Sequence, residues 1–388
     1  MRMKSALLRH SAIVCAAIVA STATVRAAEV KPLGSLDIGV GGFSNWYAIF
    51  GDIGNKAGGG KNGSYDFFTD NEIYIYPTYK DAKTGLEYGA VVQLESDTNT
   101  DDNADETYVF IKGKFGEVRV GDGNGVVEQM VTGAQPLNSF TGGLDGINSP
   151  DDQGVLAFGS NTADATKLVY YSPVFAGFQA GVSLTPSTDS NGQDIKTTND
   201  AGDVQDVVEG GLSYTNQFGV LGLKTSLTGA IGRFSSDDGQ SRDYNQVAGG
   251  VDFSLYGVTF GGALGHTKGA RPFSTAAGDV GDLNGGNYIG NFVFEPGAKQ
   301  TFYNLGATTD VGPVNLSLVY GQTISSHVGN PDGTPDGSDP KPLAVYGAAS
   351  VPVAPGLTVG TEIGYFNNRD NTDNNDGVFG IGGVQLAF

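Results

Sequence analysis

Apolar and polar residues alternate one by one along many stretches of about ten residues, which is the period of a β-strand with two different faces. In residues 86–95, Leu86 and Val92 fall on one face, whereas Glu87 and Gln93 fall on the other. The same alternation recurs further along the chain, in residues 246–255 and 357–366. Each stretch predicts a strand with one apolar and one polar face. The apolar residues expected to point outward include Leu86, Val92, Leu357, Val359 and Ile363.

The connections favour a barrel over a soluble sandwich, because short and long connections alternate. All six short ones contain glycine, which supplies the positive φ of tight hairpins: 114–116, 175–177, 218–220, 256–257, 311–313 and 354–356. The long ones are polar: 96–105, 186–205, 268–300, 325–342 and 368–376. Short turns on one rim and long loops on the other are typical of outer-membrane barrels. A sandwich has no reason to sort its connections in this way.

Sixteen segments are predicted as strands: 33–45, 67–79, 86–95, 106–113, 117–122, 166–171, 178–185, 206–217, 221–234, 243–255, 258–267, 301–310, 314–324, 343–351, 357–367 and 377–388. A closed barrel of this size leaves an open aqueous lumen, whereas eight strands would be filled by side chains. Closure also gives each backbone N–H and C=O a partner that lipid cannot provide. We therefore expect an all-β, 16-stranded antiparallel transmembrane β-barrel.

The composition supports this class and excludes two others. Charged residues are 16% of the chain against roughly 25% in ordinary globular domains, and 61 of the 388 residues are glycine. No apolar run of about 18 residues follows residue 27, which excludes a helical membrane protein. The net charge of −20 excludes a nucleic-acid partner, because binding phosphates needs a basic face.

The N-terminus has the features of a secretory signal peptide. Arg2 and Lys4 are basic, residues 11–21 are apolar, and Val25-Arg26-Ala27 offers small residues for cleavage. We expect residues 1–27 to be removed together with Cys15, the only cysteine, leaving 361 residues with a net charge of −24. An anchor helix is the alternative, but the apolar run is only about half as long as a membrane-spanning helix.

Enzymatic and metal sites find little support in the sequence. His266 and His327 lie in or beside predicted loops, and no nucleophile elbow or zinc-protease motif accompanies them. The acidic runs 97–105 and 330–339 could hold Ca²⁺ through carboxylate oxygens, but neither keeps the ligand order of an EF-hand. Solvated turns are the better interpretation. We therefore expect no catalytic residue, no metal site and no cofactor.

Residues 105–122 (DETYVFIKGKFGEVRVGD) and 167–184 (KLVYYSPVFAGFQAGVSL) each hold two strands around an aromatic–glycine turn, and the last strand ends in Phe388. These segments resemble the Gram-negative general diffusion porins, and the rest of 33–388 is similar to them in architecture and spacing. A terminal Phe is the usual assembly signal of such barrels, although an edge strand of a soluble sheet could also end in Phe. The resemblance implies a homotrimer in the outer membrane, in contact with lipid and lipopolysaccharide and inserted by the outer-membrane assembly machinery.

The resemblance also implies that the third external loop folds inward as a constriction, and residues 123–165 occupy that position within the barrel domain 28–388. This segment contains five acids and no Lys or Arg: Glu128, Asp145, Asp151, Asp152 and Asp164. The family opposes such a loop with arginines, and here the chain departs from the pattern. By parity the lumen-facing cations are Lys112, Arg119, Lys167 and Lys224, and the lumen-facing acids are Glu87, Glu95, Glu117, Glu209, Asp252 and Glu362. For any single acid, solvated loop surface is the better interpretation, but the set, with its missing basic partners, supports a functional one.

The expected function is passive diffusion of small hydrophilic solutes and ions through a water-filled pore that prefers cations. Fixed acids in a narrow passage select cations, whereas distant charges are screened by salt. We therefore expect selectivity to depend on Glu128, Asp145, Asp151 and Asp152 more than on the run 97–105. A substrate-selective channel for a sugar or organic ion is the alternative, and an exported β-rich adhesin or lectin is a third.

Overall fold

The computed structural model describes residues 36–51, 65–97, 104–145, 155, 162–188, 192, 204–235, 241–268, 293–329, 341–369 and 374–388. The predicted signal peptide, residues 1–27, lies outside the described residues. In the described part of the chain, no helix is both long and apolar enough to cross a membrane.

Strands make up most of the described chain. Their bounds are β1 Leu36–Gly51, β2 Tyr65–Lys80, β3 Glu87–Glu95, β4 Thr107–Gly113, β5 Gly116–Asp122, β6 Thr166–Tyr171, β7 Phe178–Ser187, β8 Val204–Phe218, β9 Leu221–Ser235, β10 Ser241–Leu255, β11 Val258–Lys268, β12 Val293–Val311, β13 Val314–Gly329, β14 Leu343–Ala354, β15 Leu357–Arg369 and β16 Asn374–Ala387. Among the described residues between β5 and β6 are three short helices: α2 Val126–Gln129, η1 Gln135–Leu137 and η2 Gly143–Asp145.

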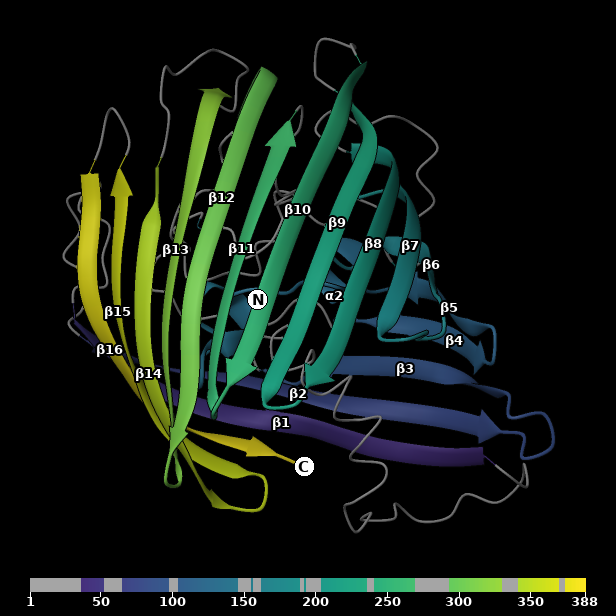
Figure 1. The fold of residues 1–388 in the computed structure, drawn as a ribbon, viewed down its shortest axis with the longest axis horizontal. Coiled ribbons are helices and arrows are strands. Elements are labelled where there is room, and N and C mark those ends of the chain that lie inside the picture. Colours follow the sequence, from purple (N-terminus) through teal and green to yellow (C-terminus); the bar gives the residue numbers. More distant parts are fainter. Residues whose placement is uncertain are drawn as a thin grey trace.

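The sheet closes on itself (Figure 1). Each strand pairs antiparallel with the next along the chain, and β1 also pairs with β16. The predicted 16-stranded antiparallel barrel is therefore confirmed. The largest difference in bounds is at β12, which begins at Val293 inside a stretch predicted as loop. Pro296 and Gly297 interrupt the alternation there, and the pairing with β13 shifts register between Phe294 and Lys299.

Alternation divides each strand between an inner and an outer face. In β15, Glu362 and Phe366 are buried, whereas Ile363 and Tyr365 are exposed. Val359 and Ile363, predicted to point outward, are exposed large apolar residues. The other predicted outward residues are half-buried: Leu86, Val92 and Leu357. An apolar outer face and a polar interior are the arrangement that a barrel in lipid requires.

The six predicted short turns all have a glycine with positive φ: Gly116, Gly177, Gly219, Gly257, Gly312 and Gly356. In two of them the preceding residue, Ala176 or Tyr256, also has positive φ, as in type I′ hairpins. At the same rim, Phe388 continues the pairing with β1. Its N–H donates to the Gly42 carbonyl at 3.1 Å, and its carbonyl accepts from the Gly42 N–H at 3.0 Å.

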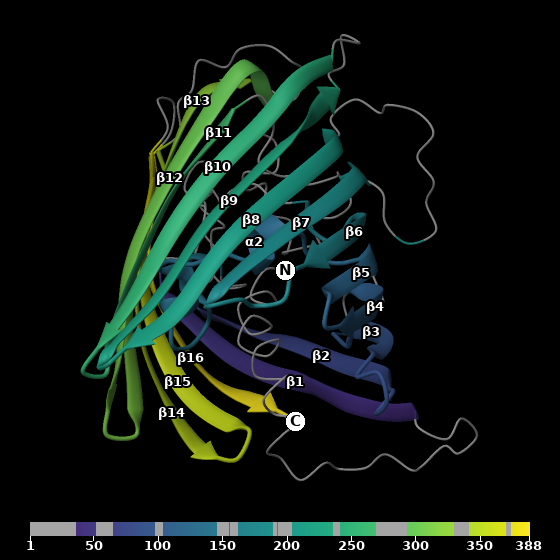
Figure 2. The same cartoon turned by 45° about the vertical axis from the view of Figure 1, so that its right-hand side comes forward.

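The wall of the barrel differs in height around the ring (Figure 2). The strands β4, β5 and β6 have only six or seven residues each, and we call them the short wall. By contrast, β12 has 19 residues and β13 has 16. A tilted strand needs about 9–11 residues to cross the hydrocarbon layer. The short wall falls below this length.

Candidate functional site

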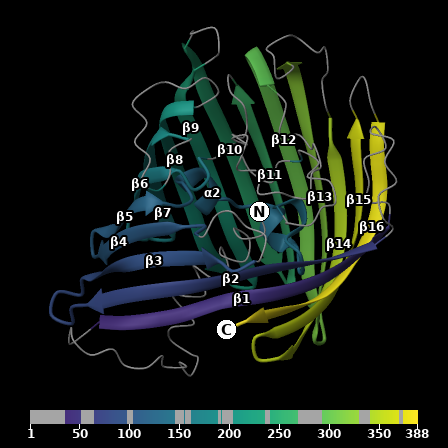
Figure 3. The same ribbon diagram turned by 180° about the vertical axis from the view of Figure 1, so that it is seen from behind.

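The chain between β5 and β6, residues 123–165, is called loop 3 here, and its described residues, 123–145, 155 and 162–165, lie inside the barrel. Its helix α2 packs against β7, β8 and β9 inside the ring of strands (Figure 3). Further along, the Ala134 N–H donates to Asn304 Oδ1 on β12 at 3.0 Å. Asn138 Nδ2 donates to Glu362 Oε2 on β15 at 2.7 Å. Loop 3 therefore follows the inner wall from β7 to β15, as predicted for an inward-folded third loop.

The inner wall presents glycine where loop 3 lies against it. A Cβ on Gly250 of β10 would lie 1.8 Å from the Thr132 carbonyl oxygen. A Cβ on Gly360 of β15 would lie 2.3 Å from the Phe140 ring. Close contacts with loop 3 side chains occur in the same way at Gly181, Gly211 and Gly321. Much of the glycine on the inner face therefore serves to let the loop approach the wall.

The second half of loop 3 is packed into an apolar cluster inside the barrel. Phe140 is buried, and its ring meets Tyr47 of β1 edge-on at 5.6 Å between centroids. The other buried members come from loop 3 and from β1, β14, β15 and β16, and include Val155, Tyr346, Phe366, Phe379 and Ile381. Burying large side chains in this way holds the loop to the wall through the hydrophobic effect.

The register shows which of the charged residues assigned to the lumen by parity are neighbours across the strands. Neighbouring strands bring Glu87, Lys112 and Glu117 into one row. Three more of the predicted acids are buried at positions that loop 3 covers: Glu209, Asp252 and Glu362. Parity identifies the face of a strand correctly, but it does not reveal what lies over that face.

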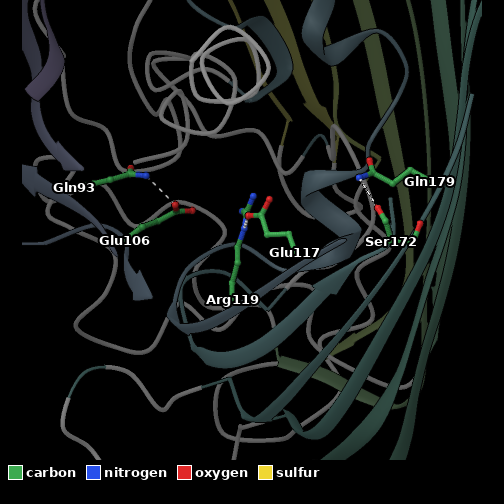
Figure 4. A network of polar contacts seen from close by, with 6 residues as sticks. All are labelled: Gln93, Glu106, Glu117, Arg119, Ser172 and Gln179. Atoms are coloured by element: carbon green, nitrogen blue, oxygen red, sulfur yellow. Dashed lines mark hydrogen bonds and ion pairs between the residues drawn. The ribbon is translucent and has the colours of Figure 1, made fainter. Parts of the chain in front are cut away.

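Arg119 on β5 is held among other side chains of the short wall (Figure 4). Its Nε donates to Glu117 Oε1 at 2.5 Å, and the two side chains are 20% and 19% exposed. The guanidinium carbon lies 5.2 Å from the ring centroids of both Tyr108 and Tyr171. Such cation–π contacts fix the guanidinium in place, and the adjacent carboxylate offsets its charge.

Two further lysines of the inner face lie beside acids. Lys80 Nζ is 3.0 Å from Glu87 Oε2. Lys224 on β9 lies opposite Asp252 on β10 in the register. Lys112 is exposed, in the row that contains Glu87 and Glu117. These basic side chains therefore lie next to carboxylates, which offset their positive charge. The net electrostatic field of this wall is set by the other acids on it.

Three acids gather where β2 and β3 meet the connection to β4, and we call them the carboxyl band: Glu72, Glu95 and Asp105. One oxygen of each lies within 4.8 Å of the others. Glu72 and Glu95 are directly opposite each other in the register. Carboxylate oxygens at this spacing could hold a divalent cation. The run 97–105, predicted as an external loop, therefore brings at least Asp105 to the inner wall.

Glu106 lies next to the carboxyl band and is buried. Its Oε2 accepts from Gln93 Nε2 at 2.8 Å (Figure 4), and its Oε1 accepts from Asn124 Nδ2 at 2.7 Å. Sequence reasoning missed both Glu72 and Glu106. A signal for Glu72 was available, because it shares the inward parity of Tyr74 in the same strand.

The comparisons with known proteins agree with this architecture. A family model described as "Gram-negative porin" matches residues 14–371. The chain belongs to the Gram-negative porins. No curated protein sequence matches it.

Solved porin structures share the fold with low sequence identity. The anion-selective porin from Comamonas acidovorans is 17% identical, with a TM-score of 0.59 over 91% of this chain and 100% of that one. The outer-membrane channel DcaP of Acinetobacter baumannii is 11% identical, with a TM-score of 0.66 over 93% and 100%. OmpT of Vibrio cholerae, in its trimer form, is 12% identical, with a TM-score of 0.59 over 91% and 100%. These likenesses establish the fold, and with the family they make the chain an outer-membrane channel.

The acids of loop 3 are distributed along this porin's inner wall. Glu128 lies on α2 and is only 4% exposed, and Asp145 ends η2. Asp164 lies just before β6. Asp151 and Asp152, and the acidic run 330–339, lie outside the described residues. The described acids therefore do not form one ring.

Two acids, Glu106 and Asp164, have raised pKa values. Glu106 contacts Asn124 at the beginning of loop 3, and Asp164 lies at the end of loop 3. Burial, followed by the charge of Asp105, raises the pKa of Glu106 to about 7. Burial, followed by the charges of Asp105 and Glu106, raises the pKa of Asp164 well above its usual range. The porin thus carries at least one carboxyl group, that of Glu106, whose charge changes near neutral pH.

Proposed function

We propose that this porin lets small hydrophilic solutes diffuse passively across the outer membrane and that it prefers cations. The observation that carries the proposal is the carboxyl band, in which three acids from separate segments converge on the inner face. Described residues of loop 3 contact the wall from β7 round to β16 and β1, so the face left for the passage belongs to β2–β6. A negative field in a narrow aqueous passage concentrates cations, because low-dielectric walls focus it.

The basic residues on that face support the same sign of selectivity. Arg119 is paired with Glu117 and Lys80 with Glu87, so these cations contribute little net charge. Loop 3 has five acids and no basic residue in its sequence. The Comamonas porin is named as anion-selective, yet it shares the fold at 17% identity. Selectivity in such barrels therefore depends on lining side chains, and the lining of this chain is acidic.

We also propose that three copies assemble through the short wall, because OmpT of Vibrio cholerae, which shares the fold, has a trimer form. Strands of six or seven residues are too short to face lipid alone. On the outer face of β1 and β2, which β3 separates from the short wall, Ser44 Oγ donates to Asn71 Oδ1 at 2.5 Å, midway along the strands. At that depth in the membrane, polar side chains are costly in contact with lipid hydrocarbon, whereas contact with a neighbouring protein copy is favourable. The taller strands would face lipid and lipopolysaccharide.

We also propose that the chain is exported by means of a signal peptide, residues 1–27, which is then cleaved. The assembly machinery would insert the barrel by recognising the strand that ends at Phe388. The adhesin alternative loses its support, because porins are channel proteins.

A substrate-selective channel would transport one sugar faster than others of equal size. Swelling of liposomes in a series of sugars separates it from a diffusion pore, in which rates follow size alone.

The test of cation preference is the reversal potential of purified porin in a planar bilayer with a tenfold KCl gradient. The wild type should give the sign of a cation-preferring pore. Glu72→Gln, Glu95→Gln and Asp105→Asn together should bring the potential closer to zero. They should do so more than the loop set Glu128→Gln, Asp145→Asn, Asp151→Asn and Asp152→Asn, because the three acids of the carboxyl band lie together, whereas the described acids of loop 3 are spread along the wall.

The matched control is Asp81→Asn, an acid in the short turn between β2 and β3. This change should leave the reversal potential as in the wild type, because the acid lies on the rim of short turns, away from the carboxyl band. A wild-type potential of the anion-preferring sign would overturn the proposed selectivity. An unchanged potential after neutralising the carboxyl band would show that these acids do not line the passage.

A further inference from the structure

Lys167 faces the lumen by parity but is buried, with 3% of its surface exposed. It is the second residue of β6 and lies opposite Gly121 on β5. Its ammonium group donates to three backbone carbonyls, those of Gly123, Ala163 and Ala165, the last two at 2.6 Å. A lysine ammonium has three N–H donors, so each donor has one acceptor.

The three carbonyls belong to both ends of loop 3. The ladder between β5 and β6 ends at the pair Asp122 and Thr166. Gly123 is the next residue on one side, and Ala163 and Ala165 lie just beyond the ladder on the other. A continued ladder would carry both strands upward as an external hairpin. Lys167 instead gathers these carbonyls around one point on the inner face, from which the chain enters the lumen.

Ala163 adopts a backbone conformation that needs support. Its φ is 42°, in the left-handed region that alanine disfavours. The bond from its carbonyl to Lys167 Nζ is one of the interactions that can stabilise this conformation. The turn into the lumen at this end of loop 3 therefore depends on a strained residue held by a charged donor.

Glu209 is a second buried charged residue that contacts both ends of loop 3. Glu209 of β8 accepts from Ser183 Oγ at 2.6 Å, from Thr162 Oγ1 at 3.2 Å and from the Val127 N–H at 3.4 Å. Thr162 and Val127 belong to opposite ends of loop 3. The carboxyl groups that face Lys167 electrostatically are those of Glu209, Asp164, Glu106 and Glu128. One ammonium group therefore lies among four carboxyl groups, which come from β8, loop 3 and the connection before β4.

We propose that Lys167 is a positioning residue that turns both ends of loop 3 into the lumen, and that its charge acts on the loop and not on permeating ions. This inference rests on the proposed cation-preferring pore for one of its two readouts. The other readout, conductance, depends only on the loop constricting the channel.

The two possible roles of Lys167 predict opposite effects of Lys167→Met. As a positioning residue, its loss releases loop 3, so single-channel conductance should rise about twofold or more and cation preference should fall as the loop acids leave the passage. As a pore-lining cation, its loss should leave conductance nearly unchanged and increase cation preference. Lys112→Met is the matched control, because Lys112 is an exposed inner-face lysine with no described bond to loop 3. It should increase cation preference without widening the pore.

Rescue at the same position separates positioning from general loss of stability. In a Cys15→Ser background, Lys167→Cys carries the chain's one thiol. Alkylating the unfolded protein with bromoethylamine restores an ammonium group of nearly the length of lysine, whereas iodoacetamide adds a neutral amide. After refolding, the aminoethyl form should regain wild-type conductance and the amide form should not. Equal behaviour of the two forms would overturn the proposal.

Lys167→Gln is the second variant if the cysteine chain does not fold. It keeps two N–H donors on a shorter side chain, and folding is checked by heat-modifiable mobility in detergent. Raised conductance with reduced cation preference supports the positioning role, whereas wild-type conductance contradicts it. If the wild type itself prefers anions, the proposed selectivity fails while the conductance comparison still tests Lys167.

Discussion

The closest approach of loop 3 to the barrel wall can be tested with two neighbouring glycines on β10. A Cβ on Gly250 would lie 1.8 Å from the carbonyl oxygen of Thr132 in loop 3. A Cβ on Gly249, one residue earlier and on the outer face, would lie 3.5 Å from the nearest atom, which is an ordinary contact. Gly250→Ala and Gly249→Ala therefore make the same chemical change on opposite faces of one strand.

The size of the effect follows from the contact distances. A carbon and a carbonyl oxygen approach to about 3.3 Å, so the Thr132 carbonyl must move by roughly 1.5 Å to accept an alanine at position 250. Because the clash is with backbone, a side-chain rotation cannot relieve it. Overpacking of this kind costs about 1–3 kcal/mol. The shift pushes loop 3 away from β10 and into the passage, so the pore should narrow.

Single-channel conductance in a planar bilayer is the measurement, with heat-modifiable mobility as the check that both variants fold. Gly250→Ala should conduct less than the wild type, and Gly249→Ala should conduct as the wild type does. Equal conductance of the two variants would mean that loop 3 does not lie against β10. The inward path of the loop would then be wrong at that point.

Two further predictions concern protons and lipid. The raised pKa of Glu106, about 7, means that the carboxyl is mostly ionised at pH 8 and mostly neutral at pH 6. Cation preference should therefore fall as the pH is lowered through 7, and Glu106→Gln should flatten this dependence. The raised pKa of Glu106 also affects stability. It stabilises the folded barrel below pH 4.5, and this contribution is lost as the pH rises through 7. Ile363→Lys, at a 64% exposed outer position in the middle of β15, should cost roughly 2–4 kcal/mol in chemical unfolding from lipid vesicles. Glu87→Lys on the inner face should cost less than about 1 kcal/mol, and equal losses would refute the assignment of faces.

The strands, their number and their two faces could be predicted from the sequence alone. The physical reason is that the alternation has a period of two residues and is imposed locally, by lipid on one side and water on the other. The short turns were predictable for a similar reason. Their glycines adopt positive φ, as Gly257 does at 84°, and few other residues adopt that conformation at low cost.

The composition of the site depended on the tertiary structure. Glu72, Glu95 and Asp105 come from three segments, and they converge only because the β2–β3 register and the path of the following connection bring them together. Sequence parity assigns Lys167 and Glu209 to the lumen, and in the structure both side chains are buried. It could not reveal that loop 3 covers them, because the path of a loop depends on contacts with strands far away in the chain. Alternation thus specifies which way a side chain points, whereas the closed barrel and its inserted loop decide what that side chain meets.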